Sequence, residues 1–477
     1  MKAFILINKL LLLAFVTCAQ SFDGTWEGKL QVSVQLRVVL MISTSTNGTL
    51  KATLKSPDQS SDLLFTDTCF VKNDSIFFTA KKYAVSFKGK LNGVNTIQGV
   101  FTQGRDFPLT LKKVDSISEL KRPQTPRPPF NYHSEEVTFY NSDHSIQFAG
   151  TLSWPATEPG LEYFKKPVYP AAILISGSGA QDRDETIFGH KPFAVLADYL
   201  TKKGFAILRV DERGIGKSTG DFNNATTADF ANDTEAALDF LKEQSQIDTA
   251  HIGLIGHSEG GLIAPMVAAR RTDVSFVVLM AAPGMAITKL MNEQVEAIAK
   301  SAGNDAALVQ AGKELYALAV TEVLKQKDSN LIKINLIKKV ENWATKKNKS
   351  LLKKMELSTP VQRKLFVTSQ LSVLNNKWYR YFLGVDPQRY LTKLQCNVLA
   401  LNGSKDIQVL PASNLAGLRV SLKKSKSPHY EVKELPGLNH LFQTCKTCTL
   451  AEYGELEESF SPAAMDVIGN WLLQYGR

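Results

Sequence analysis

The sequence predicts two domains: a small all-β domain, then an α/β domain with a mostly parallel sheet and an inserted helical cap. The length of 477 residues exceeds that of one ordinary domain. Short alternating apolar runs fill the first quarter, and apolar strand-like runs alternate with helical patterns after it. An apolar content of 44% and a charged content of 21% are typical of a folded globular protein.

Residues 1–19 have the pattern of a signal peptide. Lys2 and Lys9 precede an apolar run at 10–16, which is too short to span a bilayer. The small residues Thr17 and Ala19 suit cleavage after Ala19. Lipidation at Cys18 is the alternative, but residues 15–17 fit a lipoprotein box poorly. We therefore expect a secreted or periplasmic protein with no integral membrane segment after cleavage.

Residues 20–116 are predicted to form the all-β domain, as a calycin-like barrel or a sandwich. Turn signals such as Asn47-Gly48 and Asn92-Gly93 separate its alternating runs. The predicted strands are 30–34, 36–42, 49–54, 75–79, 84–88 and 96–101. The domain contains no catalytic constellation, so a structural appendage and a substrate- or surface-binding module both remain open.

The segment 117–133 is rich in proline and marks the domain boundary. Prolines at this density favour an extended, semi-rigid spacer.

Residues 134–477 are predicted to form the catalytic α/β domain. Its expected strands are 136–140, 145–154, 171–175, 206–210, 252–255, 276–280, 397–401 and 430–435, and its helices include 193–203, 226–246 and 262–270. Apolar strands separated by helices indicate a parallel sheet covered on both faces. Ligands bind such sheets at the carboxyl ends of the strands.

A helical stretch at about 287–391 interrupts this alternation and is predicted to be a cap over the site. Much of the net charge of +10 lies there, in lysines that alternate with apolar residues at helical spacing. Solvated helix faces explain this charge, and no nucleic-acid-binding motif accompanies it.

The pentapeptide Gly256-His257-Ser258-Glu259-Gly260 carries the strongest functional signal. A strand-like run precedes it and a helical run follows it, which is the context that a G-x-S-x-G nucleophile elbow requires. The sharp turn exposes the serine hydroxyl and needs small neighbours. Ser258 is therefore the predicted nucleophile, and the His257 side chain is expected to be structural and to point away from the reacting centre.

A serine nucleophile needs a base and an orienting acid, which follow it in this fold in the order acid, then histidine. Asp406 lies just after the strand 397–401, and His440 lies just after the strand 430–435. Both positions are at the carboxyl ends of strands, on the same edge as Ser258. Asp406 and His440 are therefore predicted to complete the triad.

The oxyanion of the intermediate needs backbone donors. One is expected from the N–H of Glu259, and the second from the loop after the strand 171–175, at Ser178 or its neighbour Gly179. Further along this loop, Asp182, Arg183 and Asp184 are predicted to form an ion-pair network; a metal site there would lack further ligands at suitable spacing.

Three segments together carry a resemblance to a known family. They are residues 211–218 (DERGIGKS), 177–184 (GSGAQDRD) and 437–443 (GLNHLFQ). The chain from about residue 135 onward, without most of the cap, resembles secreted bacterial esterases of the α/β-hydrolase fold, near the dienelactone-hydrolase and serine aminopeptidase (S9/S33-like) families. The resemblance implies that Ser258, Asp406 and His440 are the triad.

The expected activity is ester hydrolysis through an acyl-enzyme, on a small-molecule or glycan-linked ester and without cofactor or metal. A peptidase, a thioesterase or acyltransferase on the same triad, and a non-catalytic binding protein remain alternatives. Cys445 and Cys448 form either a local disulfide or two free thiols.

Overall fold

The computed structural model describes residues 21–32, 35–58, 63–117, 121–156 and 167–477. The predicted signal peptide therefore lies outside the described residues. Contacts divide the chain into two compact units after Glu119, inside the predicted linker segment. No helix in the described ranges is both long enough and apolar enough to cross a bilayer.

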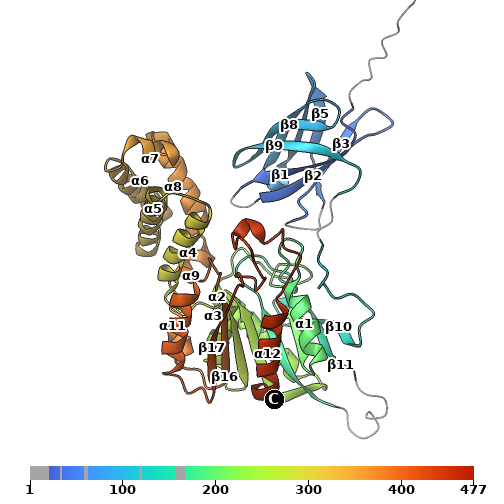
Figure 1. The fold of residues 1–477 in the computed structure, drawn as a ribbon, viewed down its shortest axis with the longest axis vertical. Coiled ribbons are helices and arrows are strands. Elements are labelled where there is room, and N and C mark those ends of the chain that lie inside the picture. The colour runs from blue at the N-terminus through green and yellow to red at the C-terminus, as the bar shows by residue number, and fades with distance from the viewer. Residues whose placement is uncertain (1–20, 33–34, 59–62, 118–120, 157–166) are drawn as a thin grey trace, which may run out of the picture. The chain divides into compact units, whose positions relative to one another are not determined.

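The first unit is a single antiparallel sheet (Figure 1). Its described strands follow the order β4-β3-β2-β1-β9-β8-β7-β6-β5, and β3 also contacts β5. Their bounds are β1 Gly24–Gln31, β2 Gln35–Thr44, β3 Leu50–Lys55, β4 Leu64–Phe65, β5 Thr68–Lys72, β6 Ser75–Ala80, β7 Val85–Leu91, β8 Thr96–Gln103 and β9 Arg105–Val114. One continuous sheet fits the barrel alternative of the prediction and not the sandwich.

Two features of this unit differ from the sequence prediction. The first strand runs over Gly24–Gln31 instead of 30–34, and its Trp26 is fully buried. The strands β4, β5 and β9 were not predicted, and in β9 Pro108 interrupts the alternating pattern. Only residues 111–114 of β9 pair with β1. Pro108 therefore pairs with Val100 of β8 and has no partner in β1, so its missing N–H costs no hydrogen bond to β1.

The second unit contains an eight-stranded sheet in the described residues, with the order β10-β11-β13-β12-β14-β15-β16-β17. β11 is antiparallel to both of its neighbours, and β13 to β17 are parallel with β12. The bounds are β10 Tyr132–Tyr140, β11 Gln147–Pro155, β12 Tyr169–Ile175, β13 Ala206–Val210, β14 Ile247–His257, β15 Phe276–Met280, β16 Asn397–Gly403 and β17 Tyr430–Leu435.

Helices cover both faces of this sheet. Alternate residues of β12 point to opposite faces: Ile173 joins the core beneath α2, α3 and α11, and Leu174 joins the core beneath α1 and α12. The helix bounds are α1 Pro192–Lys202, α2 Thr227–Lys242, α3 Gly260–Ala268, α11 Pro411–Leu422 and α12 Pro462–Tyr475. The predicted α/β fold is confirmed.

The predicted helical cap is present between β15 and β16 (yellow to orange in Figure 1). Its helices are α4 Ile287–Ser301, α5 Ala306–Lys325, α6 Ser329–Ala344, α7 Lys349–Lys354, α8 Pro360–Leu374, α9 Lys377–Leu383 and α10 Gln388–Leu391. In α6, Ile332, Leu336 and Val340 are buried, whereas Lys333 and Lys338 are exposed. The lysines of the cap therefore do lie on solvated faces of amphipathic helices.

The proline-rich segment is not a free spacer along its described length. The Arg122 guanidinium donates hydrogen bonds to the backbone carbonyls of Phe188, Gly454 and Leu456. The Gln124 amide bonds to the backbone of Phe460 at both its oxygen and its nitrogen. Two polar side chains between the prolines thus anchor this segment to the second unit, which composition alone does not reveal.

Candidate active site

Ser258 lies at the sharp turn between β14 and α3. Its φ of 54° is in the left-handed region, as a strained nucleophile elbow requires. The flanking glycines are needed because the backbone approaches closely there. A Cβ on Gly256 would lie 2.1 Å from the carbonyl oxygen of Gly260, and one on Gly260 would lie 2.1 Å from that of Ile175.

The structure brings the three predicted triad residues together. The His440 Nε2 atom lies 3.1 Å from Ser258 Oγ, and its Nδ1 atom lies 2.8 Å from Asp406 Oδ2. The other carboxylate oxygen of Asp406 accepts the backbone N–H groups of Gln408 and Val409. Since the carboxylate accepts from Nδ1–H, Nε2 is free to accept the hydroxyl proton of Ser258. This arrangement can deprotonate a serine nucleophile.

A cavity of about 270 Å³ opens at Ser258. Its sheet side includes Gly177, Ser178, Glu259 and His440. The cap supplies a largely apolar wall, namely Leu290, Met291 and Gln294 from α4 and Trp378, Tyr379 and Phe382 from α9. The cap therefore shapes the pocket, as the sequence predicted.

The predicted oxyanion residues divide in two groups. Ser178 and Glu259 line the cavity, and no protein acceptor is assigned to either backbone N–H among the described residues. Gly179 is not part of the cavity lining. The N–H of Gly177 is already used, because it donates to Glu185 Oε1 at 2.7 Å. Ser178 and Glu259 are thus the two residues available to hold an oxyanion.

The Glu259 side chain has a role that the sequence analysis missed. Its buried carboxylate accepts hydrogen bonds from Ser178 Oγ, Thr227 Oγ1 and Trp378 Nε1, each at 2.7 to 2.8 Å. Burial raises the pKa of Glu259, and these three hydrogen bonds only partly offset that rise. One side chain therefore links the elbow, the oxyanion loop and the cap. Nothing in the sequence around Trp378 signals this contact.

The prediction that His257 points away from the reacting centre is wrong. His257 is among the residues that line the cavity, and its ring lies 4.9 Å from the ring of His440, centroid to centroid. Its Nδ1 atom bonds to Glu185 Oε1, and its Nε2 atom bonds to the carbonyl oxygen of His440. The sharp turn at Ser258 and the hydrogen bonds to Glu185 and to the main chain of His440 hold the ring beside His440 instead.

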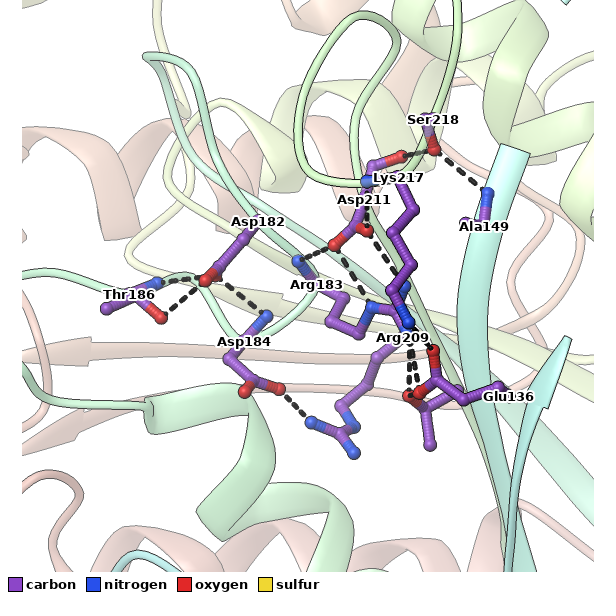
Figure 2. A network of polar contacts seen from close by, with 11 residues as sticks. Glu136, Ala149, Asp182, Arg183, Asp184, Thr186, Arg209, Asp211, Lys217 and Ser218 are labelled. Carbon is purple, nitrogen blue, oxygen red and sulfur yellow. Dashed lines mark hydrogen bonds and ion pairs between the residues drawn. The ribbon is translucent and has the colours of Figure 1, made fainter. Parts of the chain in front are cut away.

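A polar network holds the oxyanion loop (Figure 2). Arg183 forms a bidentate pair with Asp211 and contacts Glu136, and Asp184 pairs with Arg209 and Lys191. Asp182 instead accepts hydrogen bonds from the backbone of Asp184 and from Thr186. The predicted ion-pair network is therefore present for Arg183 and Asp184, whereas Asp182 acts as a turn-stabilising acceptor.

The same network explains the 211–218 motif. Asp211 also accepts the N–H of Lys217, and a Cβ on Gly216 would lie 2.4 Å from the Asp211 carboxylate. Ser218 Oγ donates to the Asp211 carbonyl and accepts the N–H of Ala149 (Figure 2). The motif therefore ties two sheet strands to the oxyanion loop and contributes no reacting group.

Two further groups near His440 are structural in their contacts. Cys445 and Cys448 form a disulfide, which selects between the two alternatives of the sequence analysis. With Glu452 they are the candidate metal-binding group in the described part of the chain, but their sulfurs are bonded to each other. His190 is buried against Ser459 and the Tyr453 carbonyl and is not part of the cavity lining. Burial lowers the pKa of His190 to about 4.

Comparisons with known proteins agree with this architecture. A family model described as serine aminopeptidase, S33, matches residues 191–443. Esterase EstD of Thermotoga maritima is 30% identical over 128 residues, which cover 27% of this chain and 30% of that protein. An uncharacterized 31.7 kDa protein from the traX-finO intergenic region of Escherichia coli is 26% identical over 251 residues, covering 50% of this chain and 78% of that protein.

Solved structures show similar chains at low identity. The hypothetical protein PA2218 of Pseudomonas aeruginosa has a TM-score of 0.44 and 16% identity, covering 76% of this chain and 100% of its own. The Pyrococcus furiosus esterase Pf2001 has a TM-score of 0.42 and 13% identity, covering 76% and 99%. The match of more than half of the chain to the family model, on this sheet and elbow, shows that the protein belongs to the serine aminopeptidase S33 family of α/β-hydrolases.

Proposed function

We propose that the protein is a serine hydrolase that cleaves carboxylic esters through an acyl-enzyme on Ser258. One observation carries the proposal: an unbroken hydrogen-bonded chain from Asp406 through His440 to Ser258 ends at a cavity with a largely apolar wall. His440 takes the hydroxyl proton as Ser258 attacks the ester carbonyl, and Asp406 stabilises the imidazolium that forms.

The later steps use the same groups. The N–H groups of Ser178 and Glu259 hold the oxyanion of the tetrahedral intermediate. The imidazolium then protonates the leaving alcohol, which leaves an ester between the acyl group and Ser258. Water deprotonated by His440 attacks this acyl-enzyme and releases the acid. The reaction needs no redox step, and each proton that His440 takes up is returned.

The substrate that we propose is a small-molecule or glycan-linked ester with a short or medium acyl chain. The cavity of about 270 Å³ is slightly smaller than the range of about 300–1,000 Å³ that is usual for ligand sites. We also propose that the protein acts outside the cytoplasm, because the Cys445–Cys448 disulfide persists in an oxidising compartment.

The test is hydrolysis of aryl esters from acetate to octanoate beside a panel of amino-acid anilides, with the full chain and with Ser258→Ala. Ester turnover that disappears in Ser258→Ala is the expected result. Ester turnover that remains in Ser258→Ala would mean that another residue carries the reaction. A folded wild-type protein that hydrolyses none of the esters would argue against an esterase.

An aminopeptidase is the second candidate, and the Glu259 carboxylate favours it. Glu259 lines the cavity, and the hydrogen bonds it accepts come from neutral donors only. A carboxylate in that position could pair with a substrate ammonium group. Turnover of anilides with a free α-amino group, and not of their N-acetyl forms, would select the aminopeptidase.

Trp378→Ala tests whether the cap sets the acyl preference. Trp378 is part of the cavity wall and stacks on Phe382 with a centroid distance of 5.3 Å. Removing the indole enlarges the pocket, so we expect the ratio of kcat/KM for octanoate to that for acetate to rise roughly tenfold.

The control for this prediction is Trp378→Phe, which retains a stacked ring but loses the hydrogen bond to Glu259. It should shift the ratio much less than Trp378→Ala does. An unchanged ratio in both variants would mean that the acyl chain does not contact α9.

A further inference from the structure

Glu185 and His257 form a buried polar pair beside the triad that the proposed mechanism does not use. Their side chains are only 5% and 6% exposed, and Nδ1 of His257 lies 2.8 Å from Glu185 Oε1. Glu185 comes from the oxyanion loop, whereas His257 directly precedes the nucleophile. Glu185 also has a φ of 51°, so its backbone is held in the left-handed region.

The pair touches each of the three segments that must be aligned for catalysis. The same Oε1 atom of Glu185 accepts the N–H of Gly177 at 2.7 Å, which fixes the start of the oxyanion loop. Nε2 of His257 lies 2.9 Å from the carbonyl oxygen of His440, which fixes the main chain of the base. Because His257 is covalently next to Ser258, these contacts join the nucleophile to both other segments.

Both ring nitrogens of His257 have an oxygen acceptor within hydrogen-bonding distance. A carbonyl oxygen only accepts, so Nε2 of His257 must donate to His440. Oε1 of Glu185 accepts from Gly177 and also faces Nδ1, which makes Nδ1 a second donor. Burial disfavours the imidazolium, but the Glu185 carboxylate and the hydrogen bond to His440 raise the pKa of His257 above its usual value. Both ring nitrogens of His257 therefore face oxygen acceptors, which favours the protonated ring beside Glu185.

Stability alone does not account for such a pair. A buried ion pair often contributes no more stability than apolar side chains of the same volume. A hydrogen-bonded pair differs from an apolar pair in direction, because each hydrogen bond holds one group at a defined position. Here these groups are the donor loop at Gly177 and the main chain of His440.

We propose that Glu185 and His257 are positioning residues for the triad, with the Glu185 carboxylate orienting His257 and Gly177 while His257 holds the main chain of His440. This inference rests on the proposed function, since it assumes that Ser258 and His440 react. Without the pair, the base and the oxyanion loop can shift relative to Ser258. A shift of about 1 Å can lower the rate of the chemical step roughly 100-fold.

The test compares Glu185→Ala and His257→Phe with two matched controls. Glu322→Ala removes a buried carboxylate of α5 that lies outside the cavity lining and accepts a hydrogen bond from Asn335 Nδ2. His190→Phe removes another buried histidine that bonds a side chain and a backbone carbonyl. For each variant, three quantities are measured: Tm, the rate constant for labelling of Ser258 by a fluorophosphonate, and kcat and KM per labelled site on the best aryl ester.

We expect kcat per labelled site and the labelling rate constant to fall roughly 10- to 100-fold in Glu185→Ala and His257→Phe, with KM changed by less than about threefold. The controls should lose a similar amount of Tm and keep kcat per labelled site within about twofold of wild type. Glu185→Gln keeps an acceptor for Gly177 and a partner for His257, so it should recover most of the lost rate. The double variant should be no slower than the slower single variant, because the two residues act as a unit.

Wild-type values of kcat and labelling rate per site in both Glu185→Ala and His257→Phe would overturn the inference and leave the proposed function standing. A wild-type protein that the fluorophosphonate does not label would instead overturn the proposed function, and the inference with it. If Glu185→Ala does not fold, His257→Phe and Glu185→Gln still test the inference, because each new side chain is close in volume to the one it replaces.

Discussion

Asp406→Asn is expected to lower kcat/KM for the best ester by about 10³- to 10⁴-fold while the protein stays folded. The carboxylate now accepts Nδ1–H of His440 at 2.8 Å and two backbone N–H groups. An asparagine that keeps its oxygen on those backbone groups turns its NH₂ toward His440. The imidazole must then accept at Nδ1 and carry its proton on Nε2, so it cannot take the proton of Ser258.

A second Asp–His pair in this chain provides the control. Asp248 lies at the opposite end of β14, and its Oδ2 atom contacts Nδ1 of His251 at the same 2.8 Å. Asp248→Asn makes the same chemical change on the surface, so kcat/KM should stay within about twofold of wild type. Steady-state kinetics of both variants at pH 7 decide the matter. Comparable losses would mean that Asp406 acts through folding, and no loss in Asp406→Asn would remove Asp406 from the proposed triad.

The chain order of the proposed triad was predictable because each of its residues follows a strand that the apolar pattern identifies. The strands Phe276–Met280 and Tyr430–Leu435 were predicted with their observed bounds. Parallel strands bring their carboxyl ends to one edge, so Asp406 and His440 had to lie near Ser258 once the sheet was recognised. The distances between the three side chains, by contrast, come only from the structure.

The supporting contacts were not predictable, because they join positions whose sequence separation carries no pattern. Glu185 and His257 are 72 residues apart, and Trp378 and Glu259 are 119 apart. Each of these side chains is unremarkable in its own segment: Glu185 lies in a loop, and Trp378 lies on a short cap helix. Tertiary packing alone creates these pairs. The position of the Arg122 side chain on the second unit is hidden from the sequence for the same reason.

Arg183→Met is expected to destabilise the second unit by about 3–5 kcal/mol, the cost of leaving a buried charge without its partner. The side chains of Arg183 and Asp211 are 12% and 5% exposed, and the guanidinium binds the carboxylate through two nitrogens. Methionine retains much of the volume but leaves the Asp211 carboxylate with only backbone donors. Thermal unfolding followed by far-UV circular dichroism at pH 7 measures the loss.

The loss should depend on pH in a direction that the pKa of Asp211 determines. Burial opposes ionisation, but the hydrogen bonds from Arg183 and from backbone N–H groups lower the pKa of Asp211 below its usual value. The pair therefore stabilises the fold above the unfolded-state pKa of about 3.9, and that contribution is lost as the pH falls through the folded-state pKa. In Arg183→Met the pKa of Asp211 rises, so the buried carboxylate is protonated, and loses its charge, at a higher pH than in wild type. The difference in free energy of unfolding between Arg183→Met and wild type should therefore become smaller below about pH 5.

The matched control is Arg271→Met, which breaks a pair with Asp273 and Asp239 at the surface, where Asp239 is 61% exposed. It should cost no more than about 1 kcal/mol. An equal loss in both variants would mean that burial is not what makes the Arg183 pair strong. If Arg183→Met alone is destabilised, its kcat per labelled site should also fall. Arg183 lies five residues from Ser178, and its backbone N–H and side chain both bind Asp211 (Figure 2), so losing the guanidinium frees the loop that presents one of the oxyanion donors.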